Sequence, residues 1–158
     1  MSTTNPDIDP LLEESIEITA PPERVWQLVT DLPRMASWSP EVAKTIVRGG
    51  GPVGLGTTTI NINRRGLRVW PTRSKVIRFE PHTEFAFRIK DNKAIWSYSL
   101  APTAAGTKLT QRREMPDGMA GLAQGLQKVA FGGIGKYQDQ ARVGMRETLE
   151  RLKTDAEA

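Results

Sequence analysis

The chain of 158 residues contains no cysteine and a single histidine. The lack of cysteine excludes disulfides, thiol nucleophiles and thiolate metal sites. His82 follows Pro81 in a predicted turn, so a Ser-His-Asp arrangement would depend on one exposed turn residue. Zinc sites are built mainly from histidine and cysteine. The sequence therefore predicts neither a metal site nor a bound cofactor.

Long apolar runs are also absent. No stretch approaches the roughly 20 apolar residues of a membrane-spanning helix. The first residues, MSTTNPDIDP, lack the basic region followed by an apolar core that marks a secretory signal. We expect a cytoplasmic protein, with a disordered lead-in over residues 1–12 and a single domain over residues 13–158.

The glycine-rich stretches do not match nucleotide-binding motifs. Residues 132–137 read GGIGKY, but a phosphate loop needs glycine where Ala130 stands and serine or threonine where Tyr137 stands. Residues 51–56 lack the dinucleotide pattern and the surrounding crossover unit. These stretches predict no nucleotide cofactor.

Acidic residues are missing from one long segment. From Val42 to Phe79 there are eight basic residues and no acidic one, whereas residues 1–41 hold eight acidic and two basic residues. One interpretation is that the basic segment packs near the acidic start or is simply solvated surface. The alternative is a positive face that makes peripheral contact with an acidic membrane or an anionic headgroup. Nucleic acid is not expected as a partner because no recognisable nucleic-acid-binding motif is present.

The segment from Ser15 to Val47 has a distinctive order of predicted elements. Ile16 and Ile18 alternate with polar residues, as in a half-buried strand. Pro22 then suits the first turn of a helix, where its missing N–H costs nothing. Asp31 can cap a second short helix, after which a second strand begins. This order predicts a strand, two short helices and another strand.

Beyond this opening, alternating apolar positions and turn residues predict further strands, which makes seven antiparallel strands in all. Predicted bounds include 41–48, 57–64, 67–79 and 107–114, and Ile60 and Ile62 share one face of their strand. Pro71 interrupts a long strand and has no N–H, so it predicts a bulge or an edge position.

The C-terminal third is predicted to be helical. Five apolar residues recur at helical spacing and predict one long helix: Tyr137, Ala141, Met145, Leu149 and Leu152. The preceding apolar stretch holds several glycines, each of which costs a helix roughly 1 kcal/mol relative to alanine. We expect a short amphipathic helix there that breaks at residues 131–133. It would be either a connector or a gate over a cavity.

The order of these motifs resembles the START-related helix-grip superfamily, and in particular bacterial SRPBCC-type polyketide cyclase/dehydrase proteins. Similar stretches lie between about Ser15 and Lys153, and read APPERVWQLVTD, GPVGLGT, NRRGLRVW, FEPHTEFAFRI, WSYSLAPTAAGTKLT and MRETLERLK. The resemblance implies an α+β helix-grip fold: a seven-stranded curved antiparallel sheet wrapped around a long C-terminal helix, with two short helices between strands 1 and 2. It implies a shared cavity more than a shared reaction.

Candidate ligand-binding residues follow from the faces that this fold would turn toward the helix. Strand parity places Gln111 and Arg113 on the face of Leu109, unless a bulge turns Arg112 and Glu114 inward. The predicted ligand-binding set is Trp38, Trp70, Phe85, Phe87, Trp96, Tyr98, Gln111, Arg113 and Tyr137. No position can be assigned a catalytic role from the sequence.

Three functions stay open. Aromatic strand faces and the lack of a catalytic constellation favour binding of an apolar small molecule, such as a lipid, polyketide or isoprenoid-like compound. The resemblance implies a polyketide-type cyclase, aromatase or dehydratase as the alternative, with Tyr98, Arg113 and Tyr137 the first candidates for proton transfer. The third is an interaction or regulatory protein with a vestigial cavity, whose protein partner the sequence does not identify.

Overall fold

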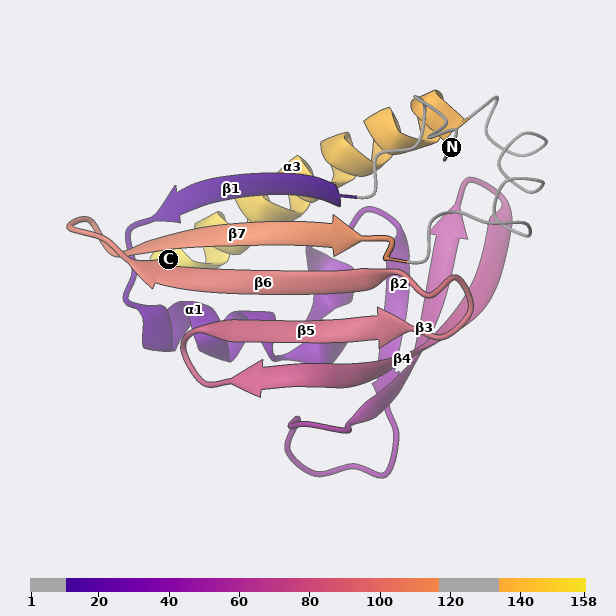
Figure 1. Cartoon of the computed structure of the whole chain (residues 1–158), viewed down its shortest axis with the longest axis horizontal. Coiled ribbons are helices and arrows are strands. Elements are labelled where there is room, and N and C mark those ends of the chain that lie inside the picture. Colours follow the sequence, from indigo (N-terminus) through magenta and orange to yellow (C-terminus); the bar gives the residue numbers. More distant parts are fainter. Residues whose placement is uncertain (1–10, 117–133) are drawn as a thin grey trace, which may run out of the picture.

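One antiparallel sheet with the strand order β1-β7-β6-β5-β4-β3-β2 dominates the computed structural model, which describes residues 11–116 and 134–158 and only the backbone of residues 134–138. The strands are β1 (Leu11–Ile18), β2 (Val42–Val47), β3 (Thr58–Arg65), β4 (Arg68–Glu80), β5 (Glu84–Ile89), β6 (Ile95–Pro102) and β7 (Thr107–Glu114). The long helix α3 (Ile134–Glu157) crosses one face of this curved sheet and packs against β1 (Figure 1). The predicted seven strands and long C-terminal helix are confirmed.

Two short helices join β1 to β2. Helix α1 (Pro22–Val29) starts on proline and has Glu23 in its first turn, as the sequence predicts. The second, η1 (Leu32–Ser37), is a 3-10 helix with Asp31 at its N-cap position. The Asp31 side chain makes no capping hydrogen bond. Pro33 has no N–H to donate, and the N–H of Arg34 donates instead to the backbone carbonyl of Asp31.

The strand boundaries differ from the predicted ones by a few residues. β1 begins at Leu11, before the expected domain start at residue 13, and Leu12 is fully buried. Pro71 pairs in regular register with Ile62 of β3, whereas the pairing of β4 with β5 begins only at Ser74. Pro71 therefore lies where β4 has a sheet neighbour on one side, which is the predicted edge position.

The apolar core lies between the sheet, α1 and the C-terminal part of α3. Trp26 of α1 packs edge-on against Phe79 of β4 and Phe85 of β5, with ring centroids 5.2 Å and 6.2 Å away. Leu149 and Leu152 of α3 are almost completely buried in the same cluster. Burial of this helical stripe is the hydrophobic contribution that holds α3 on the sheet.

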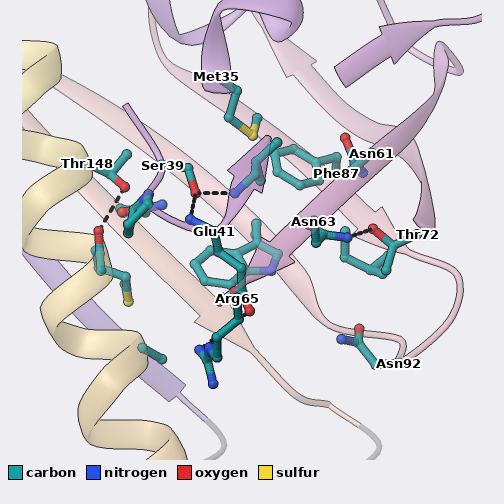
Figure 2. A pocket seen from close by; sticks show the side chains of 18 of the residues that line it. Met35, Ser39, Glu41, Asn61, Asn63, Arg65, Thr72, Phe87, Asn92 and Thr148 are labelled. Carbon is teal, nitrogen blue, oxygen red and sulfur yellow. Dashed lines mark hydrogen bonds and ion pairs between the residues drawn. The ribbon is translucent and has the colours of Figure 1, made fainter. Parts of the chain in front are cut away.

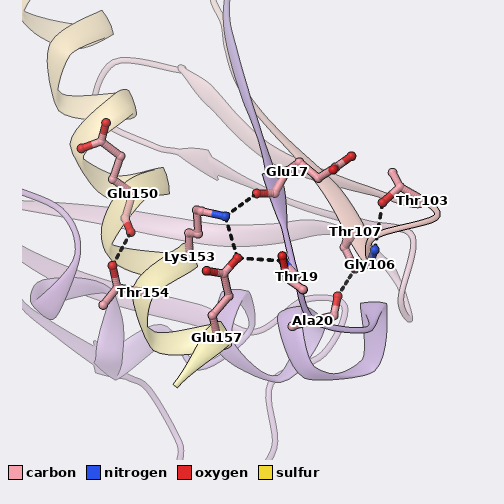
Figure 3. Close-up of polar contacts among 10 residues, drawn as sticks. All are labelled: Glu17, Thr19, Ala20, Thr103, Gly106, Thr107, Glu150, Lys153, Thr154 and Glu157. Atoms are coloured by element: carbon pink, nitrogen blue, oxygen red, sulfur yellow. Dashed lines mark hydrogen bonds and ion pairs between the residues drawn. The ribbon is translucent and has the colours of Figure 1, made fainter.

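Polar contacts fix the C-terminal end of α3 to β1 and the residues that follow it (Figure 3). The backbone N–H of Thr19 donates to Oε2 of Glu157 at 2.8 Å, and Nζ of Lys153 donates to the same oxygen at 2.6 Å. Lys153 also donates to the carbonyl of Glu17. The hydrogen bonds from Lys153 and Thr19 lower the pKa of the Glu157 carboxyl. This end of the helix is anchored, and the cavity described below lies nearer the opposite end.

Two further predictions concern the segment before α3 and the absence of a membrane-spanning helix. The predicted amphipathic helix and gate before α3 lie outside the described residues. Within residues 11–116 and 134–158, no helix combines the length and the hydropathy needed to cross a membrane.

Candidate functional site

A cavity of about 180 Å³ lies between the inner face of the sheet and α3 (Figure 2). Strands β3 to β7 form one side, the segment from η1 to the start of β2 closes a second, and residues 140–148 of α3 form the third. Side chains from six strands and two helices therefore meet at one place, although Met35 and Thr148 at the two extremes are 113 residues apart in the sequence.

One wall of the cavity is apolar. Phe87 and Ile89 alternate along β5, and Trp96 lies opposite Phe87 on β6. Met145 of α3 and Met35 of η1 face the same space. Aromatic rings and flexible thioethers form an adaptable surface for an apolar ligand.

A second wall of the cavity, on β3 and β4, is polar. Asn61 and Asn63 of β3 and Thr72 of β4 line the cavity. Nδ2 of Asn63 donates to Oγ1 of Thr72 at 3.0 Å and to the carbonyl of Trp70 at 3.2 Å. The hydroxyl of Thr45 donates to Oδ1 of Asn61 at 3.0 Å. These bonds hold the amide groups of the wall in fixed orientations.

The sequence did not identify this polar wall. Ile60 and Ile62 share one face of β3 as predicted, but that face points away from the cavity, and Asn61 and Asn63 are buried instead. Alternation shows which residues share a face and not which face is inside. The available signal was the coincidence of small polar residues on neighbouring strands, such as Thr45 beside Asn61 in the observed register.

Tyr98 of β6 and Gln111 of β7 supply a second polar group, on the side of the cavity away from β3 and β4. Nε2 of Gln111 donates to the Tyr98 hydroxyl at 3.1 Å, and both residues are buried. Burial raises the pKa of Tyr98, so its phenol stays protonated at neutral pH. Oε1 of Gln111 is buried and has no hydrogen-bond partner among the described residues. A tyrosine hydroxyl can accept and donate at once, so this pair can bind a ligand oxygen.

A charged group, also missed by the sequence, joins α3 to the sheet beside the cavity. Nη2 of Arg65 lies 3.4 Å from Oε1 of Glu41, and Nη1 of Arg65 donates to Oε1 of Gln140 at 3.1 Å. All three residues line the cavity. Burial raises the pKa of the Glu41 carboxyl, and the positive charge of Arg65 opposes that effect. A carboxyl with a raised pKa in a cavity is a candidate proton donor or acceptor.

The raised pKa of Glu41 predicts a pH-dependent effect of replacing it. The folded state holds the Glu41 proton more tightly than the unfolded chain, whose reference pKa is 4.5. The resulting stabilisation is complete below that value and is lost as the pH rises through the folded-state pKa. Because glutamine stays neutral, the free energy of unfolding of Glu41→Gln should increase relative to wild type between about pH 4 and pH 7. Urea unfolding at both pH values measures this, and a difference that falls with pH would contradict it.

Five of the nine predicted ligand-binding residues line the cavity: Trp70, Phe87, Trp96, Tyr98 and Gln111. The side chain of Tyr137 lies outside the described part of the structure. The other three, Trp38, Phe85 and Arg113, are buried but are not among the lining residues.

Trp38 and Phe85 make contacts within the protein. The indole Nε1 of Trp38 donates to Oδ2 of Asp155 at 2.6 Å, and its carbonyl accepts from Nη1 of Arg151 at 3.0 Å. A buried tryptophan needs such a partner for its N–H, and here the partners tie the end of η1 to α3. Phe85 lies in the core cluster with Trp26 and is fully buried.

Arg113 occupies the predicted face of β7. The register with both β1 and β6 is continuous, which places Arg113 beside Leu12 on one side and Trp96 on the other. Arg113 is only 2% exposed, whereas Arg112 points to the other face and forms an ion pair with Glu13 at 2.6 Å. The bulge that would have reversed these faces is absent from β7.

Solved structures with the same fold come from several bacteria. A solution NMR structure of a Polyketide_cyc-like protein from Corynebacterium glutamicum is 32% identical over 90% of this chain and 88% of that chain, with a TM-score of 0.65. The Zhui aromatase/cyclase from a Streptomyces species has a TM-score of 0.72 at 15% identity and covers 93% of each chain.

The crystal structure of the di-domain ARO/CYC protein BexL has a TM-score of 0.73 at 22% identity. The match covers 98% of this chain and 52% of the BexL chain. No curated protein matches the chain. The model of the family described as polyketide cyclase / dehydrase and lipid transport matches residues 10–157. The chain therefore belongs to the polyketide cyclase / dehydrase and lipid transport family.

Proposed function

We propose that this protein binds an apolar small molecule with one or a few oxygen atoms, of the lipid, polyketide or isoprenoid-like class, in the cavity between the sheet and α3. The observation that carries the proposal is the pairing of an aromatic wall around Phe87 and Trp96 with a polar wall around Asn61 and Asn63. Small-molecule sites commonly combine a mostly apolar lining with a few placed polar groups.

The volume limits what can be bound. Ligand pockets usually enclose about 300–1,000 Å³, and this cavity encloses about 180 Å³. A small aromatic molecule, or one end of a longer chain, fits this space. The polar groups would then select ligands by their oxygen atoms, since leaving a buried donor or acceptor unpaired costs roughly 1–3 kcal/mol.

The Tyr98 hydroxyl gives the sharpest test of this proposal. 2-Naphthol, a fused-ring aromatic with one hydroxyl, and naphthalene, which lacks it, form a matched pair of probes. In Tyr98→Phe the affinity for 2-naphthol should fall roughly tenfold, because a hydrogen bond worth about 1–1.5 kcal/mol is lost. The affinity for naphthalene should change little, because the ring volume of residue 98 is nearly kept.

Fluorescence titration of both proteins with both probes measures the two ratios. Equal losses for the two probes would show that residue 98 acts on packing alone. No loss for either probe would place the ligand elsewhere and contradict the proposed site.

A polyketide-type cyclase, aromatase or dehydratase is the second candidate function, and the Glu41–Arg65 pair is the observation that favours it. Such cyclisations begin with removal of a proton from a carbon beside a carbonyl group, followed by stabilisation of the enolate oxygen. Glu41, whose pKa is raised, would take the proton, and Arg65 or Tyr98 would stabilise the oxygen. Under this function Glu41→Gln should slow deuterium exchange at the central carbon of a model 1,3-diketone to the rate in buffer, while 2-naphthol binding persists.

A further inference from the structure

The turn between β3 and β4 carries an aliphatic side chain, that of Leu67, which is exposed to solvent. Arg65 pairs with Arg68, so Gly66 and Leu67 form a two-residue turn. Gly66 has a φ of +60°, which glycine adopts without strain. Leu67 is fully exposed, and Val69 is 62% exposed. We refer to residues 64–69 as the hairpin tip.

The hairpin tip is strongly basic as well as apolar. Arg64 and Arg68 flank the turn, Arg65 beside them pairs with Glu41, and the acid-free segment from Val42 to Phe79 surrounds all three in sequence. Nε of Arg64 donates to the carbonyl of Gly66 at 3.2 Å, which keeps this guanidinium close to the turn. An exposed leucine within a cluster of arginines has the chemistry of a membrane interface, where an apolar side chain enters the acyl boundary and cations contact phosphates.

We propose that the hairpin tip docks this protein on an anionic membrane surface by inserting Leu67 between the lipid headgroups. The aliphatic side chain at the tip favours a membrane over a nucleic acid. A phosphodiester backbone would form ion pairs with the arginines but would leave Leu67 in water. The short turn favours insertion too, since β3 and β4 hold Leu67 at the end of a rigid ladder that projects beyond the rest of the sheet (Figure 1).

The hairpin tip lies beside the cavity. Arg65 within the tip and Trp70, which directly follows it, both line the cavity, and Arg65 also contacts Gln140 of α3. Docking would therefore place the cavity next to the lipid, where apolar ligands concentrate. The docking proposal itself rests on the exposure and charge of the tip and does not require the cavity to be filled.

The absence of cysteine makes a direct test possible. Leu67→Cys introduces a single thiol, which can carry the environment-sensitive dye NBD. Leu55→Cys is the matched control, because Leu55 is also an exposed loop leucine, at 72%, but lies in the β2–β3 loop at the opposite end of β3 (Figure 1). With vesicles of phosphatidylcholine and phosphatidylglycerol, NBD at position 67 should shift to the blue and brighten, whereas NBD at position 55 should not change. Vesicles of phosphatidylcholine alone should affect neither.

Co-sedimentation of unlabelled protein with the same vesicles gives the energetic test. Leu67→Ser should weaken binding roughly tenfold through lost apolar burial. The double variant Arg64→Gln/Arg68→Gln should weaken it by about twentyfold, and raising the salt concentration should weaken it further. Failure of the wild-type protein to sediment with anionic vesicles, or an equal response at positions 55 and 67, would overturn the proposal. Leu67→Ser should bind 2-naphthol normally, so a failure here is distinguishable from a failure of the cavity proposal.

Discussion

Replacing Ala141 with tryptophan is expected to weaken 2-naphthol binding by roughly a hundredfold or more. Ala141 lines the cavity from α3, and the cavity holds only about 180 Å³. An indole ring at this position would take the space that a fused-ring ligand needs. The ligand would then lose most of its apolar burial. We expect this to cost about 3 kcal/mol of binding free energy, which corresponds to roughly a hundredfold in affinity. Fluorescence titration measures the loss.

Val143→Trp is the control for this experiment. Val143 lies two residues further along α3 and is 52% exposed, so the same indole ring would point to solvent there. Circular dichroism should show both variants folded. If Ala141→Trp binds 2-naphthol as the wild type does, or if both variants lose binding equally, the ligand does not occupy the space beside Ala141.

Replacing Gly106 with alanine is expected to lower the free energy of unfolding by roughly 3 kcal/mol, a large effect for one added methyl group. Gly106 lies in the β6–β7 hairpin, which crosses the end of β1 (Figure 3). A Cβ atom at this position would overlap the carbonyl oxygen of Ile18 and lie 2.6 Å from the backbone nitrogen of Ala20. Both are backbone atoms of a buried segment, so neither can move aside without disturbing β1. Urea unfolding measures the change.

Gly54→Ala is the matched control. Nothing lies within 4 Å of a Cβ atom at Gly54, so this change should leave stability within about 0.5 kcal/mol of wild type, or raise it slightly. A similar loss of unfolding free energy in the two variants would mean that Gly106 does not lie in close contact with Ile18 and Ala20.

Much of the fold could be predicted from the sequence because its signals are local. Alternating apolar residues and short turns predict strands wherever they occur, and the last strand was predicted with the observed bounds, Thr107–Glu114. The helical stripe of Met145, Leu149 and Leu152 is buried as its spacing predicts. Even the parity argument for Gln111 and Arg113 holds, because β7 pairs without interruption on both sides.

The cavity was less predictable because its members meet only in three dimensions. Trp38 is of a residue type that often lines ligand sites. Its indole N–H, however, donates a hydrogen bond to Asp155, which lies 117 residues away in the sequence. In the sequence Glu41 is one acidic residue among many, and only its position at the cavity beside Arg65 makes it distinctive. Asn61 and Asn63 follow an alternation that fits either face of β3 equally well.

The same limits apply to the family resemblance. Membership of the polyketide cyclase / dehydrase and lipid transport family accounts for the sheet and the long helix that packs on it. Fold alone does not set function, so the choice of ligand and any proton transfer would depend on the side chains that line the cavity. The cavity of this chain has a small volume, a neutral phenol at Tyr98 and a carboxyl with a raised pKa at Glu41, and candidate ligands can be chosen to match these features.

Native mass spectrometry of gently purified protein, with organic extraction of whatever is released, tests the central claim most directly. The cavity account predicts a stoichiometric apolar adduct on the wild-type protein and none on Ala141→Trp, and the extract would name the chemical class of the ligand. An empty wild-type protein that also gains no thermal stability from lipids, aromatic polyketides or 2-naphthol would contradict the account. So would an adduct that remains on Ala141→Trp.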